Sequence, residues 1–221
     1  LDPACGSGHM LTYAFDLLYA IYEEEGYPPA DIPGLILAHN LHGLEICPRA
    51  TQLAQFALVC KARERNRNAF RQPIAPRVMC LQNVVIGDGE LAAWAKAIKL
   101  EWMIAGPALE QLQQFRENTE TFGSLIQPVM EPAAIVGMKR LIGDEAPPGD
   151  LFLQDTHRKI RLVLDQAEML SQRYHVVVTN PPYMGSKQMN GSLKEFAADL
   201  YTDSKADLFG MFIERGFTLA R

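Results

Sequence analysis

The segment that does most to decide the fold is LDPACGSGHM, residues 1–10. An apolar start followed by two closely spaced glycines is typical of the turn between the carboxyl end of a strand and the next helix. Over residues 10–25, apolar side chains recur at spacings of three and four, as in a helix with one buried face. We therefore expect a strand, a glycine-rich turn and a helix. Because most of that strand would precede residue 1, we also expect the chain to be a fragment of a longer protein.

Short apolar runs and helical segments continue to alternate along the chain. Strands are predicted at 41–46, 77–85 and 174–179, and helices at 50–65 and 207–220. The run YHVVVT at 174–179 is the clearest strand because its centre is β-branched. Residues 90–172 show a helical pattern interrupted by prolines, which indicates a helical insertion.

This order predicts an α/β fold with a Rossmann-like, doubly wound and mainly parallel sheet. The expected organisation is a core made of residues 1–89 and 173–221, with the helical insertion at 90–172 between them.

The composition is that of an ordinary globular protein. Of the 221 residues, 48% are hydrophobic and 21% are charged, which excludes a disordered chain. The four cysteines form no CxxC pair, so we expect neither a metal site nor a disulfide framework, and a cytoplasmic location. No apolar run approaches the roughly 20 residues of a membrane helix, and no signal peptide is visible.

The net charge of −5 argues against a chain that binds a nucleic-acid backbone by itself, because such binding needs clustered Lys and Arg. One basic stretch does occur, with Lys61, Arg63, Arg65, Arg67, Arg71 and Arg77. It could touch phosphates, but a solvated helix end is the simpler interpretation.

The glycine-rich turn can bind a ligand closely, because Gly6 and Gly8 carry no side chain and the next helix presents free N–H groups. A dinucleotide fingerprint needs a third glycine where Leu11 stands, and an acidic residue about 20 positions on. Glu45 lies 37 positions after Gly8, at the end of the second predicted strand. Both departures disfavour NAD, whereas S-adenosylmethionine would fit, with Glu45 accepting hydrogen bonds from its ribose. The alternative is a tight turn that binds nothing.

The second motif is NPPY, residues 180–183, directly after the strand predicted at 174–179. An aromatic amine is a poor nucleophile until two acceptors take both of its N–H bonds. The side-chain oxygen of Asn180 and the carbonyl of Pro181 can be these acceptors, since consecutive prolines remove competing N–H donors. Tyr183 offers a flat face for a planar base. The alternative is a simple strand terminator and turn.

Together, DPACGSG at 2–8 and NPPY at 180–183 resemble motifs I and IV of the gamma-order adenine-N6 DNA methyltransferases. Longer stretches resemble the large methyltransferases of BREX and phage-growth-limitation defence systems (PglX-like) and their type IIG restriction-modification relatives. These stretches are YHVVVTNPPYMGS at 174–186, DSKADLF at 203–209 and FGSLI at 122–126.

The resemblance implies a class I S-adenosylmethionine-dependent methyltransferase core, with a cofactor-binding part at 1–89 and a catalytic-loop part at 173–221. It implies a catalytic loop of Asn180, Pro181, Pro182 and Tyr183, and no metal. The family usually carries an Asp after its third strand, where this chain has Gln82 and Asn83. The cofactor-binding residues so implied are Asp2, Pro3, Ala4, Cys5, Gly6, Gly8, His9, Met10, Glu45, Ile46, Asn83 and Asn180.

The expected function is site-specific adenine-N6 methylation of double-stranded DNA in a restriction-modification or BREX-type defence system. Protein-glutamine or RNA amine methylation is an alternative, as is a cofactor-binding component of a defence complex that is inactive on its own. We expect DNA and defence-complex subunits as partners, with most DNA contacts outside this fragment. The fragment alone should therefore bind DNA weakly.

Overall fold

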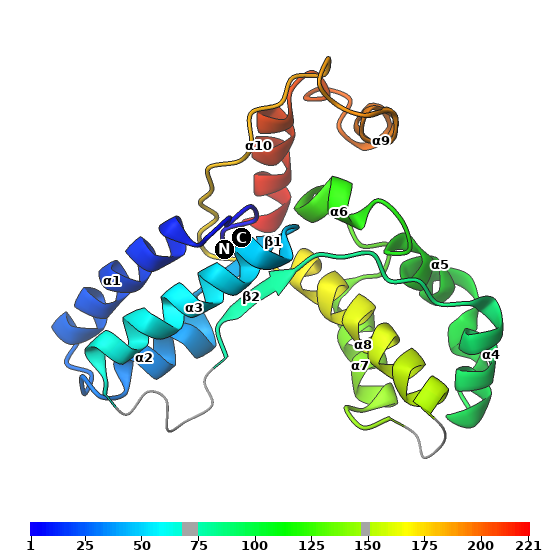
Figure 1. Cartoon of the computed structure of the whole chain (residues 1–221), viewed down its shortest axis with the longest axis horizontal. Coiled ribbons are helices and arrows are strands. Elements are labelled where there is room, and N and C mark those ends of the chain that lie inside the picture. Colours follow the sequence, from blue (N-terminus) through cyan, green and yellow to red (C-terminus); the bar gives the residue numbers. More distant parts are fainter. Residues whose placement is uncertain (68–74, 147–150) are drawn as a thin grey trace. The chain divides into compact units, whose positions relative to one another are not determined.

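The computed structural model describes residues 1–67, 75–146 and 151–221 (Figure 1). The chain divides into two compact units, of which the first combines Leu1–Leu81 with Tyr174–Arg221 and the second is Gln82–Arg173. The insertion was expected over residues 90–172, and the chain passes into the second unit at Gln82.

The first unit contains helices and a small parallel sheet. In chain order its elements are α1 (His9–Glu24), α2 (Ile32–Leu35), the π-helical turn η1 (Ile36–Asn40), β1 (His42–Glu45), α3 (Pro48–Arg65), β2 (Arg77–Cys80), α9 (Gly191–Leu200) and α10 (Leu208–Leu219). The helices expected at 10–25, 50–65 and 207–220 are confirmed as α1, α3 and α10. Pro48 begins α3, where its fixed φ suits the first helical position.

Strands β1 and β2 pair in parallel, with His42 opposite Arg77 and Glu45 opposite Cys80. On the other side of β1, Asp2 forms a parallel bridge to Gly43. Asp2 N donates to His42 O at 3.0 Å, and its carbonyl accepts from the N–H of Leu44 at 2.9 Å.

A fourth segment lies beside Leu1. The terminal amino group of Leu1 donates to Val176 O at 2.8 Å, and the N–H of Val178 donates to Leu1 O at 2.9 Å. Leu1 thus bonds to the residues on either side of position 177, which is the hydrogen-bond pattern of parallel strands. The order across these segments is therefore Arg77–Cys80, His42–Glu45, Leu1–Asp2 and Val176–Val178.

The doubly wound sheet expected from the sequence is not confirmed. In the described part of the chain the assigned sheet has two strands. The strand expected at 77–85 ends at Cys80. The segment 174–179 is not assigned as a strand and shows, besides its hydrogen bonds to Leu1, an isolated bridge from Tyr174 to Ala220. A ladder needs several consecutive paired residues, whereas the backbone of 176–178 forms its parallel hydrogen bonds with the single residue Leu1.

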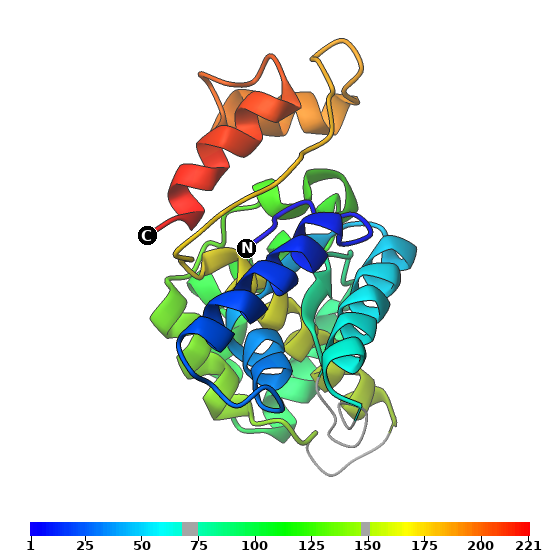
Figure 2. The ribbon, with the colours of Figure 1, turned by 90° about the vertical axis from the view of Figure 1, so that its left-hand side faces the viewer.

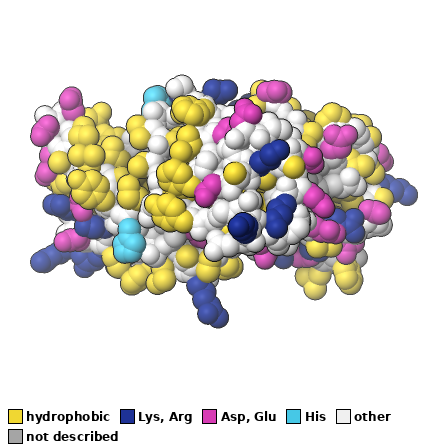
Figure 3. Space-filling view, turned by 90° about the horizontal axis from the view of Figure 1, so that it is seen from above, with side chains coloured by type: hydrophobic (Ala, Val, Ile, Leu, Met, Phe, Trp, Pro, Cys, Tyr) yellow, Lys and Arg dark blue, Asp and Glu magenta, His cyan; other side chains and the backbone are white. Residues whose placement is uncertain are grey.

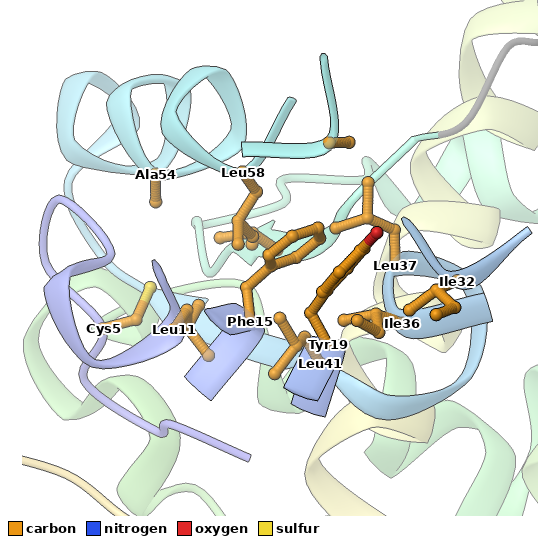
Figure 4. Close-up of a cluster of buried hydrophobic side chains, with 12 residues drawn as sticks. Cys5, Leu11, Phe15, Tyr19, Ile32, Ile36, Leu37, Leu41, Ala54 and Leu58 are labelled. Carbon is orange, nitrogen blue, oxygen red and sulfur yellow. The ribbon is translucent and has the colours of Figure 1, made fainter. Parts of the chain in front are cut away.

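The core of the first unit lies between α1, α2, η1 and α3 (Figure 4). Helices α1 and α3 lie side by side (Figure 2). Leu11, Phe15 and Tyr19 are spaced four apart on one face of α1 and are buried. Phe15 is fully enclosed, and removing such a ring typically costs about 3–5 kcal/mol. The cluster comprises Cys5, Leu11, Phe15, Tyr19, Ile32, Ile36, Leu37, Leu41, Ala54, Leu58, Ala62 and Val78.

The second unit is helical in its described part. Its elements are α4 (Asp88–Ala97), the 3₁₀ turn η3 (Glu101–Ile104), α5 (Gly106–Gln114), α6 (Thr119–Phe122), the 3₁₀ turn η4 (Gly123–Leu125), α7 (Pro132–Ile142) and α8 (Leu151–Ser171). Helix α8 contacts α4, α5 and α7. Lys139 of α7 forms ion pairs with Asp165 at 2.6 Å and with Glu168, both on α8. Of the helices that are described, none is long and apolar enough to cross a bilayer.

Candidate functional site

The glycine-rich turn leads into α1 and lies against α3. Cys5 N donates to Leu44 O at 3.0 Å and Gly8 N donates to Cys5 O at 2.8 Å, so the turn is tied to β1 and to itself. Gly6 and Gly8 have φ angles of 53° and 87°, which residues with a side chain rarely adopt. A Cβ on Gly8 would also lie 2.9 Å from the Cβ of Ala54. Both the backbone conformation and the nearness of α3 therefore require glycine at position 8.

The amino terminus of α1 follows this turn directly. Gly8 is the N-cap residue and provides no side-chain hydrogen bond to the helix. The first N–H groups of a helix lack intrahelical partners and carry partial positive charge. This end of α1 therefore suits an anionic group such as a carboxylate.

Glu45, at the carboxyl end of β1, is bound to the turn through its side chain. Its Oε2 accepts from Gly6 N at 2.7 Å, and its Oε1 accepts from Ile46 N and Cys47 N, each at 2.9 Å. An ionised carboxylate offers about four acceptor sites. Three are thus used within the chain, and one site on Oε2 remains for a hydroxyl donor.

Asp2 joins the turn to the segment that precedes the NPPY loop. The side chain is buried, with 1% of its surface exposed, and Oδ1 accepts from Ala4 N at 3.1 Å. Burial raises the pKa of the Asp2 carboxyl, while the nearby Thr179 side chain and the Ala4 amide act in the opposite direction. Because Thr179 precedes Asn180, Asp2 lies near both motifs.

The remaining predicted cofactor residues fall into three groups. Pro3 and Cys5 are buried. Burial, helped by the charges of Asp2 and Glu45, raises the pKa of the Cys5 thiol to about 12, so the thiol stays protonated and acts as a packing group. Ala4 and Met10 are half-buried, whereas His9 and Ile46 are exposed.

Asn83 belongs to the second unit. Its Oδ1 accepts from Thr119 N at 2.8 Å and thereby fixes the start of α6. This oxygen is already bonded within that unit, so the proposed contact of Asn83 with a cofactor stays a prediction.

The NPPY loop is largely open to solvent. Asn180 and Pro182 are exposed, Pro181 is buried, and Tyr183 exposes 76% of its surface. The loop follows the segment 176–178, which pairs with Leu1, and the glycine-rich turn follows Leu1 on the same side. Parallel segments end at the same edge, so the two motifs leave their paired segments on the same side.

Sequence reasoning did not indicate that Phe209 lies beside Tyr183. The rings of Tyr183 and Phe209 are stacked, with centroids 5.7 Å apart and an interplanar angle of 11°. The available signal was an aromatic residue two positions after Asp207, at the start of an apolar helical pattern. That signal does not reveal its partner, because 26 positions separate the two rings in the sequence.

The basic stretch is partly neutralised inside the first unit. Asp16 pairs with Lys61 at 2.5 Å and with Arg65 at 3.6 Å, and the Arg65 guanidinium lies 4.5 Å from the centroid of the Tyr19 ring. Arg71 lies outside the described residues. On the face drawn in Figure 3, basic and acidic side chains are interspersed. No group of three His, Cys, Asp or Glu side chains that could hold a metal occurs in the described ranges.

Comparison with known proteins agrees with these motifs. The family model described as Eco57I restriction-modification methylase matches residues 39–221. The chain therefore belongs to the Eco57I restriction-modification methylase family.

Three curated relatives carry the name of an adenine-specific methyltransferase. The chain is 38% identical over 242 residues to BrxX of Escherichia coli O9:H4 (strain HS), covering 100% of this chain and 20% of that protein. It is 36% identical over 222 residues to PglX of Lacticaseibacillus casei (strain Zhang), covering 97% and 18% respectively. For PglX of Streptomyces coelicolor (strain ATCC BAA-471 / A3(2) / M145), the identity is 24% over 233 residues, covering 100% and 15%. The chain thus spans no more than a fifth of the length of these relatives.

Proposed function

We propose that this chain is the catalytic core of an S-adenosylmethionine-dependent DNA methyltransferase. In this proposal it methylates N6 of an adenine flipped out of double-stranded DNA, in a restriction-modification or BREX-type defence system. The observation that carries the proposal is the pairing of Leu1 with Val176 and Val178. The NPPY loop and the glycine-rich turn follow these paired residues on the same side. The names of the relatives support the choice of adenine.

The fold we propose for the complete core is the class I, doubly wound sheet. Numbered along the chain, the four parallel segments have the spatial order 3-2-1-4, which is the beginning of the order 3-2-1-4-5-6 typical of such sheets. Ligands of these sheets bind where the order reverses. Here the reversal falls between Leu1–Asp2 and Val176–Val178.

The residues of the turn fit S-adenosylmethionine. When bound, this cofactor supplies an electrophilic methyl group on sulfur. The uncapped start of α1 suits its carboxylate, and the remaining acceptor site of Glu45 Oε2 suits a ribose hydroxyl. A second ribose hydroxyl could be accepted only if one of the three backbone N–H groups released the Glu45 carboxylate.

Catalysis would depend on positioning rather than on a general base. The Oδ1 of Asn180 and the carbonyl of Pro181 would accept the two N–H bonds of the target amine, which directs its lone pair at the methyl group. Pro181 and Pro182 bring no N–H donor that would compete. Tyr183 would stack on the extracted base, and its 76% exposure leaves the ring accessible for this contact. Flipping the base costs a few kcal/mol, least where pairing is weak.

DNA binding would rely mainly on parts of the longer protein outside this chain, since the net charge here is −5. Lys187 and Lys194 are exposed in the segment that follows Tyr183 and would meet phosphates of the strand that loses its base. We propose defence-complex subunits as further partners and a cytoplasmic location.

The test uses the full-length natural protein that contains this chain. Labelled S-adenosylmethionine is incubated separately with duplex DNA, RNA and a protein extract, and the products are digested and separated. We expect label in N6-methyladenine from DNA alone. Label in glutamine or in RNA would show that DNA is not the substrate. Cofactor binding without transfer to any of the three pools would show that the protein is a cofactor-binding component and not an enzyme.

A further inference from the structure

We propose that Phe209 positions the ring of Tyr183 and leaves one face of that ring for the target base. Phe209 would thus act through Tyr183 as a positioning residue, without itself contacting the base. The inference rests on the proposed function, because it assumes that Tyr183 stacks on a substrate base.

The ring geometry supports a fixed pair. The centroid separation of 5.7 Å and the angle of 11° lie in the range of offset-stacked aromatic side chains. A base held between two rings would need planes about 6.8 Å apart, twice the base-stacking distance of about 3.4 Å. Nearly parallel rings whose centroids are 5.7 Å apart leave no such space. A base must therefore use the face of Tyr183 that points away from Phe209.

Backbone hydrogen bonds hold the two aromatic residues in register. Gly185 forms an antiparallel bridge with Asp207, and Leu208 N donates to Met184 O at 2.9 Å. The chain just after Tyr183 is thereby attached to the chain just before Phe209. The position of one ring consequently fixes the range of positions open to the other.

The start of α10 is itself well fixed. The Oδ1 of Asp207 accepts from Phe209 N at 2.8 Å, so the cap and the ring-bearing residue are one local unit. Ser204 donates its hydroxyl to Glu214 Oε2 at 2.6 Å, which ties the preceding loop to the second turn of α10. The backbone of Phe209 is therefore held in place, so its ring can restrict the position of the more exposed Tyr183 ring.

A purely structural role would predict a different pattern of burial. Phe209 is 38% exposed and Tyr183 is 76% exposed, whereas core rings such as Phe15 and Phe115 are fully enclosed. Removing the Phe209 ring should consequently cost little folding stability. The removal of the ring should instead lower kcat/KM for the substrate that carries the target base.

The experiment is a double-mutant cycle in the full-length protein, with Phe209→Ala, Tyr183→Ala and the double variant. Phe209→Tyr tests rescue by a similar ring. Phe217→Ala is the matched control, since Phe217 lies on the same helix and is 76% exposed. For each variant, kcat and KM are measured for whichever substrate the wild type methylates, with S-adenosylmethionine affinity and Tm as additional readouts.

We expect Phe209→Ala to lower kcat/KM for the nucleic acid about 3- to 10-fold, in line with the strength of an aromatic pair. Phe209→Tyr should stay within about twofold of wild type, and Phe217→Ala should match wild type. In the Tyr183→Ala background, Phe209→Ala should cause no further loss. Cofactor affinity and Tm should change little.

An undiminished effect of Phe209→Ala in the Tyr183→Ala background would overturn the inference, because Phe209 would then act independently. Equal activity of Phe209→Ala and wild type would also overturn it. Failure of the proposed function gives a distinguishable result. In that case the wild-type protein would transfer label to a substrate other than adenine in DNA, or to no substrate. If Phe209→Ala lowers Tm strongly, the cycle is repeated with Phe209→Leu, which retains apolar volume but has no ring.

Discussion

The two sides of the proposed site are built differently. On the cofactor side, the turn and Glu45 are connected by short hydrogen bonds, and Gly8 lies directly against Ala54. On the target side, among the described residues, no hydrogen bond holds the Asn180 side chain, and Tyr183 has one aromatic neighbour. The cofactor side is thus arranged before any ligand binds, whereas the target side is open.

This difference fits the two ligands that we propose for the site. A small cofactor gains affinity when its site needs no reorganisation. A base extracted from a duplex must enter from outside, so its site must stay accessible until the base arrives. The contrast predicts that changes on the cofactor side affect stability and cofactor binding together, while changes on the target side affect catalysis alone.

The largest effect is expected for Gly8→Ala. The new Cβ would impose a strained φ and would overlap Ala54, together costing about 2–5 kcal/mol of folding stability. Gly6→Ala is the matched control, because Gly6 also has a positive φ but has no atom within 4 Å of the new Cβ. Thermal unfolding and calorimetric titration with S-adenosylmethionine should show a larger loss for Gly8→Ala. Equal losses for the two variants would contradict the close packing of the turn on α3.

The next largest effect is expected for Glu45→Gln. The amide group would point a donor at backbone N–H groups that now donate to the carboxylate, and one charged acceptor would be lost. We expect S-adenosylmethionine to bind about 10- to 100-fold more weakly, as for other charged hydrogen bonds. Glu64→Gln, on the exposed surface of α3, is the control. Unchanged cofactor affinity in calorimetry would remove Glu45 from the cofactor site.

Tyr183→Ala tests the target side. Loss of one stacked base is worth about 1–3 kcal/mol, so kcat/KM for DNA should fall about 5- to 150-fold. Cofactor affinity and Tm should stay at wild-type values, because the side chain is 76% exposed. Tyr183→Phe keeps the ring and should retain most activity. A large drop in cofactor affinity in Tyr183→Ala would show that the two sides are not separate.

The smallest effect is expected when the pH is lowered. Burial, with the neighbouring charge of Arg77, lowers the pKa of His42 to about 4. A base with a depressed pKa in the folded state contributes stability above its unfolded value of about 6.5, and this contribution is lost as the pH falls toward 4. Since His42 begins β1 and Glu45 ends it, acid should weaken the cofactor side.

The test compares wild type with His42→Gln between pH 7 and pH 4. The wild-type Tm should fall more steeply than that of the variant, by a few degrees over this range. Identical pH profiles would mean that His42 does not contribute.

The helices and the two motifs could be predicted from the sequence because they depend on local signals. The spacing of Leu11 and Phe15 marks α1, and Pro48 marks the start of α3. The lengths of the strands could not be predicted, since they depend on partners. The run at 174–179 is strongly β-branched, yet the bridge assigned within it is the isolated one from Tyr174 to Ala220.

The residues of the candidate site were expected from the sequence and stay a prediction, and their arrangement could not be predicted. The sequence indicated Glu45 and Asn180, but their surroundings arise from contacts between distant segments. Leu1 and Val176 are 175 positions apart, and the Gly6–Glu45 bond spans 39 positions. For the same reason, Phe209 became visible as a neighbour of Tyr183 only in three dimensions.

The most direct test of the central claim is Asn180→Ala in the full-length protein, with two readouts on one preparation. Calorimetry with S-adenosylmethionine should give an affinity close to wild type, because Asn180 is exposed and lies outside the hydrogen bonds of the turn. Mass spectrometry of digested DNA should show N6-methyladenine formation reduced at least about 100-fold, as for loss of a key polar group in other active sites. Wild-type levels of N6-methyladenine in this variant would contradict the assignment of the NPPY loop as the catalytic centre.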